Sequence, residues 1–220
     1  MKKPVLFLLM IIIASIVLAE DVKAITDNGK TVILHENGTW EILINENSQD
    51  SFDFRKINWG MSKSDVMKSE PFEWEEGELD PNTQVLYTNI DLMSEETMLV
   101  YYFNVNRVYQ TRYIIKEIHS NKTEYWRVYK RLMVELKNKY GDPVSNYTGD
   151  PIWLDDLYQD DPNDWGMAIA TGDMFALAKW NLPKNTISAL IQGDNYKINI
   201  FLEFKANNIK VIEAEETDAF

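Results

Sequence analysis

The sequence predicts an α+β fold in two layers: an antiparallel sheet with its helices on one face. Residues 123–140 carry apolar residues at the three- and four-residue spacing of an amphipathic helix. On each side of this helix lie three segments with the two-residue period of strands. Together with a short capped helix that starts after residue 62, this order predicts tandem helix-plus-three-strands units, preceded by a small β-meander.

The amino terminus has the pattern of a secretory signal peptide over residues 1–19. Lys2 and Lys3 precede an apolar run that ends at Ala19, where a small residue favours cleavage. A second cleavage point follows Ala24, and retention as an anchor is the alternative. Because a membrane-spanning helix needs roughly 20 apolar residues, we expect an exported protein, periplasmic or secreted, with no membrane span after signal cleavage.

The charge of the chain excludes some classes of partner. Its 22 basic and 35 acidic residues give a net charge of −13, which becomes −15 once Lys2 and Lys3 are removed. Such a charge repels nucleic acid and anionic lipid surfaces, so neither is expected as a partner. A basic partner, a cation or simple solubility fits the acidic charge better. The chain has no cysteine, so no disulfide supports the exported domain, and its stability must come from a core.

Residues 24–45 read as a three-stranded meander. Asp27-Asn28-Gly29 and Glu36-Asn37-Gly38 are hairpin turn signals between runs rich in β-branched residues. A unit this small is marginal alone, so we expect it to dock on the main domain or on a partner. The polar residues 46–53 then form a linker.

The main domain is predicted over residues 54–206 and opens with a short helix. Ser62 and Asp65 have the spacing of a capping pair, and Pro71 ends the helix because the residue before a proline is pushed out of the helical region. The acidic, proline-containing residues 71–83 are predicted to form a loop.

The first group of strands is predicted at residues 84–91, 97–104 and 107–117. The strand at 97–104 has apolar residues on both faces, which places it centrally in the sheet. Either both of its faces are covered within the protein, or a helix covers one face and a partner covers the other.

The long helix at residues 123–140 starts at an Asn121 and Glu124 capping pair and ends at Gly141. Its apolar stripe is expected to face the core and comprises Tyr125, Tyr129, Leu132, Leu136 and Tyr140. The second group of strands is predicted at 174–181, 186–192 and 196–204, and residues 207–220 form an acidic tail.

The connection between the long helix and the last three strands is rich in aspartate. From Tyr140 to Ala178 there are eight aspartates and no lysine or arginine. A connection this long without evident structure is either functional or mobile. It could be a solvated loop, supply oxygen ligands to calcium, or form a contact surface for a basic partner with two tryptophans as anchors. The candidate binding residues are Trp153, Asp155, Asp156, Asp160, Asp161, Asp164 and Trp165.

Two motifs resemble those of exported bacterial proteins. The segment Trp59-Gly60-Met61-Ser62-x-x-Asp65-Val66 resembles a "WGMSxxEV" helix start, and Tyr140-Gly141-Asp142-Pro143 is similar to the helix end in the same proteins. They resemble the SmpA/OmlA outer-membrane lipoproteins and the β-lactamase inhibitor proteins, and Asn37-Gly38-Thr39-Trp40 resembles the "DGTW" segments of exported proteins. The resemblance implies a two-layer fold and a role in protein contacts. Asp65 stands where Glu is usual, and no cysteine is present for a lipid anchor.

The usual catalytic and cofactor motifs are missing from the sequence. Two separated histidines without cysteine argue against a zinc site, and neither a nucleophile elbow nor a glycine-rich phosphate loop is present. We therefore expect a non-enzymatic envelope protein without a cofactor, which binds an envelope or secreted protein through its sheet or its aspartate-rich loop. One alternative is a small-ligand or lipid binder with a pocket lined by Tyr101, Phe103, Tyr129 and Met133. A carboxylate-based hydrolase is the other.

Overall fold

The structure, a computed structural model, divides the chain into two units, Met1–Gln49 and Asp50–Phe220. It describes residues 22–25, 31–34, 40–42 and 52–212. The predicted signal peptide lies outside the described residues, as does most of the predicted linker. Within the described part of the chain, no helix is both long enough and apolar enough to cross a membrane.

The first unit contains the predicted meander. Its strands are β1 (Val22–Ile25), β2 (Thr31–Leu34) and β3 (Trp40–Ile42). They pair antiparallel in the order β1-β2-β3, which confirms the three predicted strands. Both predicted turns lie outside the described residues.

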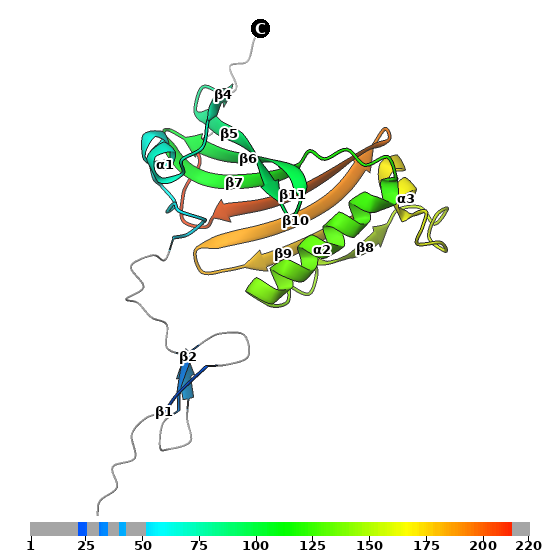
Figure 1. The fold of residues 1–220 in the computed structure, drawn as a ribbon, viewed down its shortest axis with the longest axis horizontal. Helices are drawn as coiled ribbons and strands as arrows, with labels where there is room; N and C mark the ends of the chain where they lie inside the picture. The colour runs from blue at the N-terminus through cyan, green and yellow to red at the C-terminus, as the bar shows by residue number, and fades with distance from the viewer. Residues whose placement is uncertain (1–21, 26–30, 35–39, 43–51, 213–220) are drawn as a thin grey trace, which may run out of the picture. The chain divides into compact units, whose positions relative to one another are not determined.

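The second unit is built on one antiparallel sheet of eight strands in the order β4-β5-β6-β7-β11-β10-β9-β8 (Figure 1). The strands are β4 (Glu75–Asp80), β5 (Thr83–Leu92), β6 (Glu95–Asn104), β7 (Arg107–Ile115), β8 (Thr148–Trp153), β9 (Met174–Asn181), β10 (Asn185–Asp194) and β11 (Lys197–Ala206). Two four-stranded meanders, β4 to β7 and β8 to β11, meet where β7 pairs with β11.

Three helices pack on one face of this sheet, which confirms the two-layer α+β prediction (Figure 1). They are α1 (Lys63–Ser69), α2 (Lys122–Tyr140) and α3 (Trp165–Thr171). α2 and α3 contact each other and pack on the second meander. Each meander follows a helix, so the predicted tandem order is present, but each unit has four strands instead of three.

Two sequence predictions about loops are wrong. Residues 71–83 were expected to be a loop, yet β4 lies there and pairs with β5. The connection from 140 to 178 was expected to lack structure, yet it contains β8 and α3. β4 and β8 are the two edge strands, where acidic residues and proline are tolerated because one side of the strand makes no ladder.

The segment that starts α1 is held against the sheet. Ser62 Oγ accepts a bond from the Asp65 backbone N–H at 3.2 Å and donates one to the Asp65 carboxylate at 2.6 Å, as the capping pair predicts. The bond from Ser62 lowers the pKa of Asp65. Gly60 N–H donates to Val108 O at 2.8 Å, and Val108 N–H donates to Met61 O at 3.0 Å. These bonds attach the turn before α1 to β7.

The core lies between the sheet and the helices. Leu99, Tyr101 and Phe103 of β6 are fully buried and face the helices. The predicted stripe of α2 is buried except for Tyr140, which is half-buried. The predicted tail is also held at Ile212, whose backbone N–H and C=O both bond the Asn104 side chain, at 2.8 and 2.9 Å.

Because of its buried tyrosines, the folded domain should become less stable as the pH rises above about 10. Burial raises the pKa of Tyr101, Tyr113 and Tyr129 above the ordinary value near 10. Below about pH 10 both states keep these phenolic protons, but above it the unfolded chain releases them while the folded chain does not, so unfolding becomes easier as pH rises. We expect Tyr101 and Tyr129, whose pKa values are raised the most, to cost about 1.4 kcal/mol each per pH unit above 10. Urea unfolding at pH 8 to 11, with tyrosinate absorbance recorded, checks this. Equal stability across that range would contradict it.

Candidate functional site

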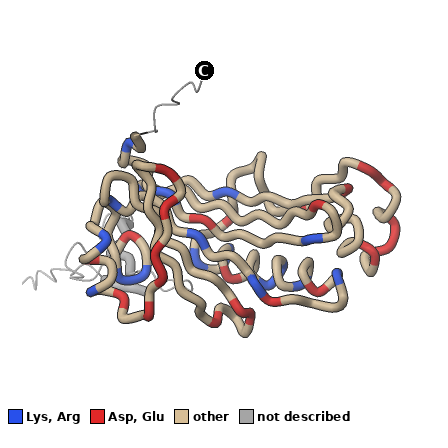
Figure 2. The backbone as a smooth tube through the Cα atoms, turned by 90° about the horizontal axis from the view of Figure 1, so that it is seen from above, with Lys and Arg blue, Asp and Glu red and all other residues tan. Residues whose placement is uncertain are grey.

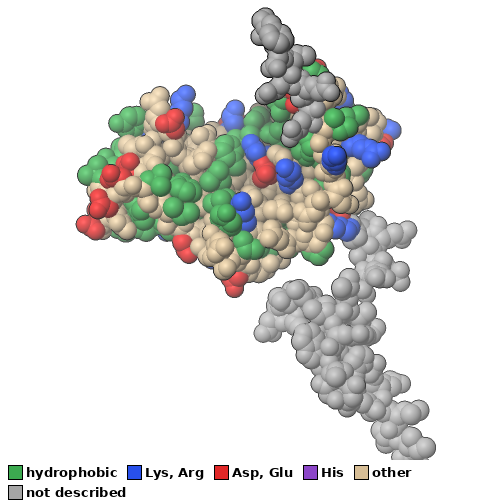
Figure 3. Space-filling model, turned by 180° about the vertical axis from the view of Figure 1, so that it is seen from behind, with side chains coloured by type: hydrophobic (Ala, Val, Ile, Leu, Met, Phe, Trp, Pro, Cys, Tyr) green, Lys and Arg blue, Asp and Glu red, His purple; other side chains and the backbone are tan. Residues whose placement is uncertain are grey.

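The face of the eight-stranded sheet opposite the helices is a candidate binding surface. No helix or strand among residues 52–212 covers it, and we call it the open face. Its side chains alternate with core residues: Phe201 is partly exposed between Ile200 and Leu202, which are 1% and 5% exposed. Figure 3 shows hydrophobic side chains gathered across the middle of this face. The strand pleat therefore presents apolar side chains on both faces of the sheet.

A row of apolar residues runs straight across five neighbouring strands of the open face. The register pairs Leu177 with Leu190, Leu190 with Phe201, Phe201 with Ile114, and Ile114 with Met98. All five are partly exposed. We call these five residues the apolar row. Contiguous apolar side chains on a soluble domain mark a contact surface more often than scattered ones do.

Beside the apolar row lies a stacked arginine. The Arg112 guanidinium lies over the rings of Phe201 and Tyr102, 5.4 and 5.7 Å from their centroids. It also donates to the Glu203 carboxylate, which accepts a further bond from Gln110 at 3.0 Å. A hollow of about 290 Å³ opens here, lined by Arg112, Leu177, Ser188, Leu190, Gln192, Phe201 and Glu203. Arginine and aromatic side chains are enriched at the centres of protein interfaces.

The aspartates predicted as a contact surface lie in the loop between β8 and α3, where Figure 2 shows acidic residues gathered. All five are exposed: Asp155, Asp156, Asp160, Asp161 and Asp164. Two of them cap local turns, since Asp155 accepts from Leu157 N–H and Asp161 accepts from Asn163 N–H, each at 2.9 Å. Within residues 52–212 and the three short strands, no three metal-ligating side chains are placed to hold an ion. The calcium alternative therefore gains no support from the described residues.

The two predicted anchor tryptophans come together, but they pack inward. The rings of Trp153 and Trp165 are 5.6 Å apart, and Trp165 lies 5.6 Å from the ring of Trp126 on α2. Trp126 is only 6% exposed, and both predicted anchors are half-buried. This cluster fixes the carboxyl end of β8 and the start of α3 onto α2.

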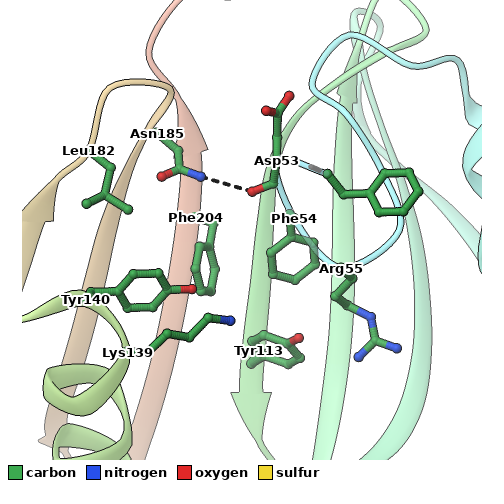
Figure 4. Close-up of a pocket in the computed structure, with 10 residues that line it drawn as sticks. Asp53, Phe54, Arg55, Tyr113, Lys139, Tyr140, Leu182, Asn185 and Phe204 are labelled. Atoms are coloured by element: carbon green, nitrogen blue, oxygen red, sulfur yellow. Dashed lines mark hydrogen bonds between the residues drawn. The ribbon is translucent and has the colours of Figure 1, made fainter. Parts of the chain in front are cut away.

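A second candidate site is a groove on the helix side, above the line where β7 and β11 join the two meanders. It consists of two adjoining cavities of about 390 and 410 Å³, and we call it the seam groove. Both cavities are lined by Tyr113, Lys139, Tyr140 and Phe204 (Figure 4). The pocket residues predicted from the sequence lie elsewhere, in the core: Tyr101, Phe103, Tyr129 and Met133 are at most 7% exposed.

Sequence reasoning anticipated contact through the sheet but missed most of the apolar row. The signal was present: in a strand with one face in water the outward positions are usually polar, yet Leu177, Leu190 and Phe201 are apolar at outward positions. The seam groove had no such signal, because its residues come from separate parts of the chain. No protein-family model, curated protein or solved structure matches this chain.

Proposed function

We propose that this chain is an exported, non-enzymatic protein that binds another protein through the open face of its sheet. The observation that carries the proposal is the apolar row, five partly exposed apolar residues in register across five neighbouring strands. The export part rests on the apolar run within residues 1–19.

The size and chemistry of the open face suit a protein partner. At about 4.8 Å between strands, the apolar row is about 19 Å long, which fits within one side of a standard interface of roughly 800 Å². Each Å² of apolar surface buried there stabilises a complex by about 25 cal/mol before the cost of association. The stacked Arg112 and the hollow beside it provide the kind of central anchor that dominates interface energies.

The edges of the sheet are poor alternatives for binding. β4 carries three glutamates in six residues, and β8 contains Pro151, which has no N–H for a strand ladder. Charges and proline on edge strands discourage pairing with another chain. The acidic loop lies at one end of the sheet (Figure 2), so we expect a partner with an apolar patch beside basic residues.

Substitution in the middle of the apolar row should abolish this binding. The variant Leu190→Glu with Phe201→Asn is expected to weaken the complex at least about 100-fold, since truncated hot-spot residues cost about 2 kcal/mol or more each. The measurement is the dissociation constant of a partner captured from envelope extract, identified and purified. A photo-cross-linker at position 190 must join the same partner to the chain.

Lys130→Gln is the matched control, because Lys130 is exposed on α2, on the other side of the sheet, and its loss changes the net charge by −1, as the double variant does. It should change affinity less than about threefold. If the double variant binds as tightly as the wild type while remaining folded, the partner contacts another surface and the proposal fails. It fails equally if sedimentation shows that the open face joins two copies of this chain.

A further inference from the structure

The seam groove exists because the two meanders have helices of unequal length. α2 has 19 residues and α1 has seven, so they are about 28 and 10 Å long. The short helix leaves part of its meander uncovered beside the junction of β7 and β11. Tyr113, Leu202 and Phe204 of these two strands line the groove.

The two ends of the seam groove differ in chemistry. One end is a trough whose apolar walls come from the end of β5, the turn after it, α2 and β11, with Glu135 and Asn138 of α2 also in its lining. The apolar residues are Leu92, Met93, Leu132, Leu136 and Leu202. The other end is polar, but its charges already have partners. Asp53 pairs with Lys184 at 2.8 Å and accepts from the Trp59 backbone N–H at 2.9 Å. Arg55 binds Glu70 at 2.8 Å.

Hydrogen-bond donors converge where the two ends join. In Figure 4 the Lys139 amino group and the Tyr140 hydroxyl project from α2 into the same space, whereas the Tyr113 hydroxyl points toward Arg55. The Lys139 amino group lies 5.2 Å from the centroid of the Tyr140 ring and makes no ion pair with any carboxylate among the described residues. An unpaired cation beside a hydroxyl suits a carboxylate.

We propose that the seam groove binds a single-chain amphiphile with a carboxylate head group, a fatty acid, independently of the open face. The carboxylate accepts bonds from Lys139 and Tyr140, and the alkyl chain lies in the trough along Leu136 and Leu202. The trough volume of about 410 Å³ is within the range of roughly 300–1,000 Å³ typical of ligand sites. The net charge of −13 opposes anionic membranes, so the expected ligand is a free molecule, not a lipid surface.

Calorimetric titration of the full chain with dodecanoate, below its micellar concentration, tests the site. We expect saturable binding of one equivalent to the wild type and at least a tenfold weaker affinity for Lys139→Glu. Lys137→Glu is the matched control, because Lys137 is exposed in the same last turn of α2 but lines neither cavity. It should bind within about twofold of the wild type.

A second variant tests the position of the alkyl chain without disturbing the core. Asn138 is exposed and lines the trough, so Asn138→Trp should fill the trough and weaken dodecanoate binding at least tenfold. Butanoate, with the same head group and a short chain, should not bind measurably. Any of four results would overturn the proposal: no saturable dodecanoate binding, equal losses in the two lysine variants, an unaffected Asn138→Trp, or binding only to anionic phosphatidylglycerol vesicles.

Discussion

Replacing Glu70 with alanine should lower the free energy of unfolding by about 3 kcal/mol. Glu70 is 1% exposed, and its carboxylate accepts from Arg55 at 2.8 and 3.3 Å and from the Tyr101 hydroxyl at 3.1 Å. Its loss leaves the Arg55 charge and a buried hydroxyl without their partner, which is more costly than never having the pair. Arg55 is 31% exposed, so water offsets part of the loss.

Glu76→Ala is the control for this experiment. Glu76 pairs with Lys63 at 2.7 Å, but its side chain is 54% exposed, so its loss should change stability by less than about 1 kcal/mol. Urea unfolding of the two variants, followed by circular dichroism, gives both values. If Glu70→Ala lowered the free energy of unfolding no more than Glu76→Ala does, the bonds from Glu70 to Arg55 and to Tyr101 of β6 would not stabilise the fold as expected.

The parts of the fold that local chemistry determines could be predicted from the sequence. The 3.6-residue period of α2 and the Ser62 and Asp65 capping pair act within one or two turns, and the structure confirms both. The β6 strand showed apolar residues on both faces, which indicated a central strand, either covered on both faces or covered by a helix on one face and a partner on the other. That strand lies between β5 and β7, as expected.

The missed elements depend on neighbours distant in sequence. β4 is the acidic segment EEGELD, whose composition does not favour a strand. It forms because the edge of β5 presents backbone N–H and C=O groups with which it pairs. β8 contains a glycine and a proline, and its register shifts between Thr148 and Pro151 where it pairs with β9. α3 has only seven residues, and although Asp164 and Gly172 stand at its two cap positions, the Asp164 side chain makes no cap bond, so the local signal for a helix is weak.

The candidate sites divide in the same way. The apolar row follows from alternation within single strands, and only the strand order was needed to align it. The seam groove depends on the pairing of β7 with β11 and on the unequal helices, which bring Tyr113, Lys139 and Phe204 together from three distant segments. The periodicity of a sequence does not show which residues from distant segments will line the same groove.

α3 is docked through two glycines, and adding a methyl group at either should release it. An alanine Cβ at Gly166 would lie 2.2 Å from backbone atoms of Lys122 and Thr123 in α2. At Gly193 it would lie 2.1 Å from the backbone oxygen of Ile169 in α3. Backbone atoms cannot move aside as a flexible side chain can, so we expect each substitution to cost about 3 kcal/mol. Gly77→Ala, whose nearest neighbour is a Val85 side-chain atom at 3.0 Å, should cost less than about 1 kcal/mol.

The sign of the Gly166→Ala effect is itself diagnostic. In a free helix, glycine to alanine stabilises by about 1 kcal/mol, so a stabilised variant would show that α3 does not pack closely on α2. Tryptophan fluorescence reports the docking directly, because Trp165 contacts both Trp126 and Trp153.

The apolar row lies on the opposite face of the sheet and has no residue in α3. Gly166→Ala should therefore change the fluorescence and free the acidic loop. A folded variant should lose less than tenfold in affinity for a partner bound at the apolar row, because the loop lies at one end of the sheet and charges at the rim of an interface act mainly on the association rate. If that affinity fell tenfold or more, α3 and its loop would belong to the binding surface.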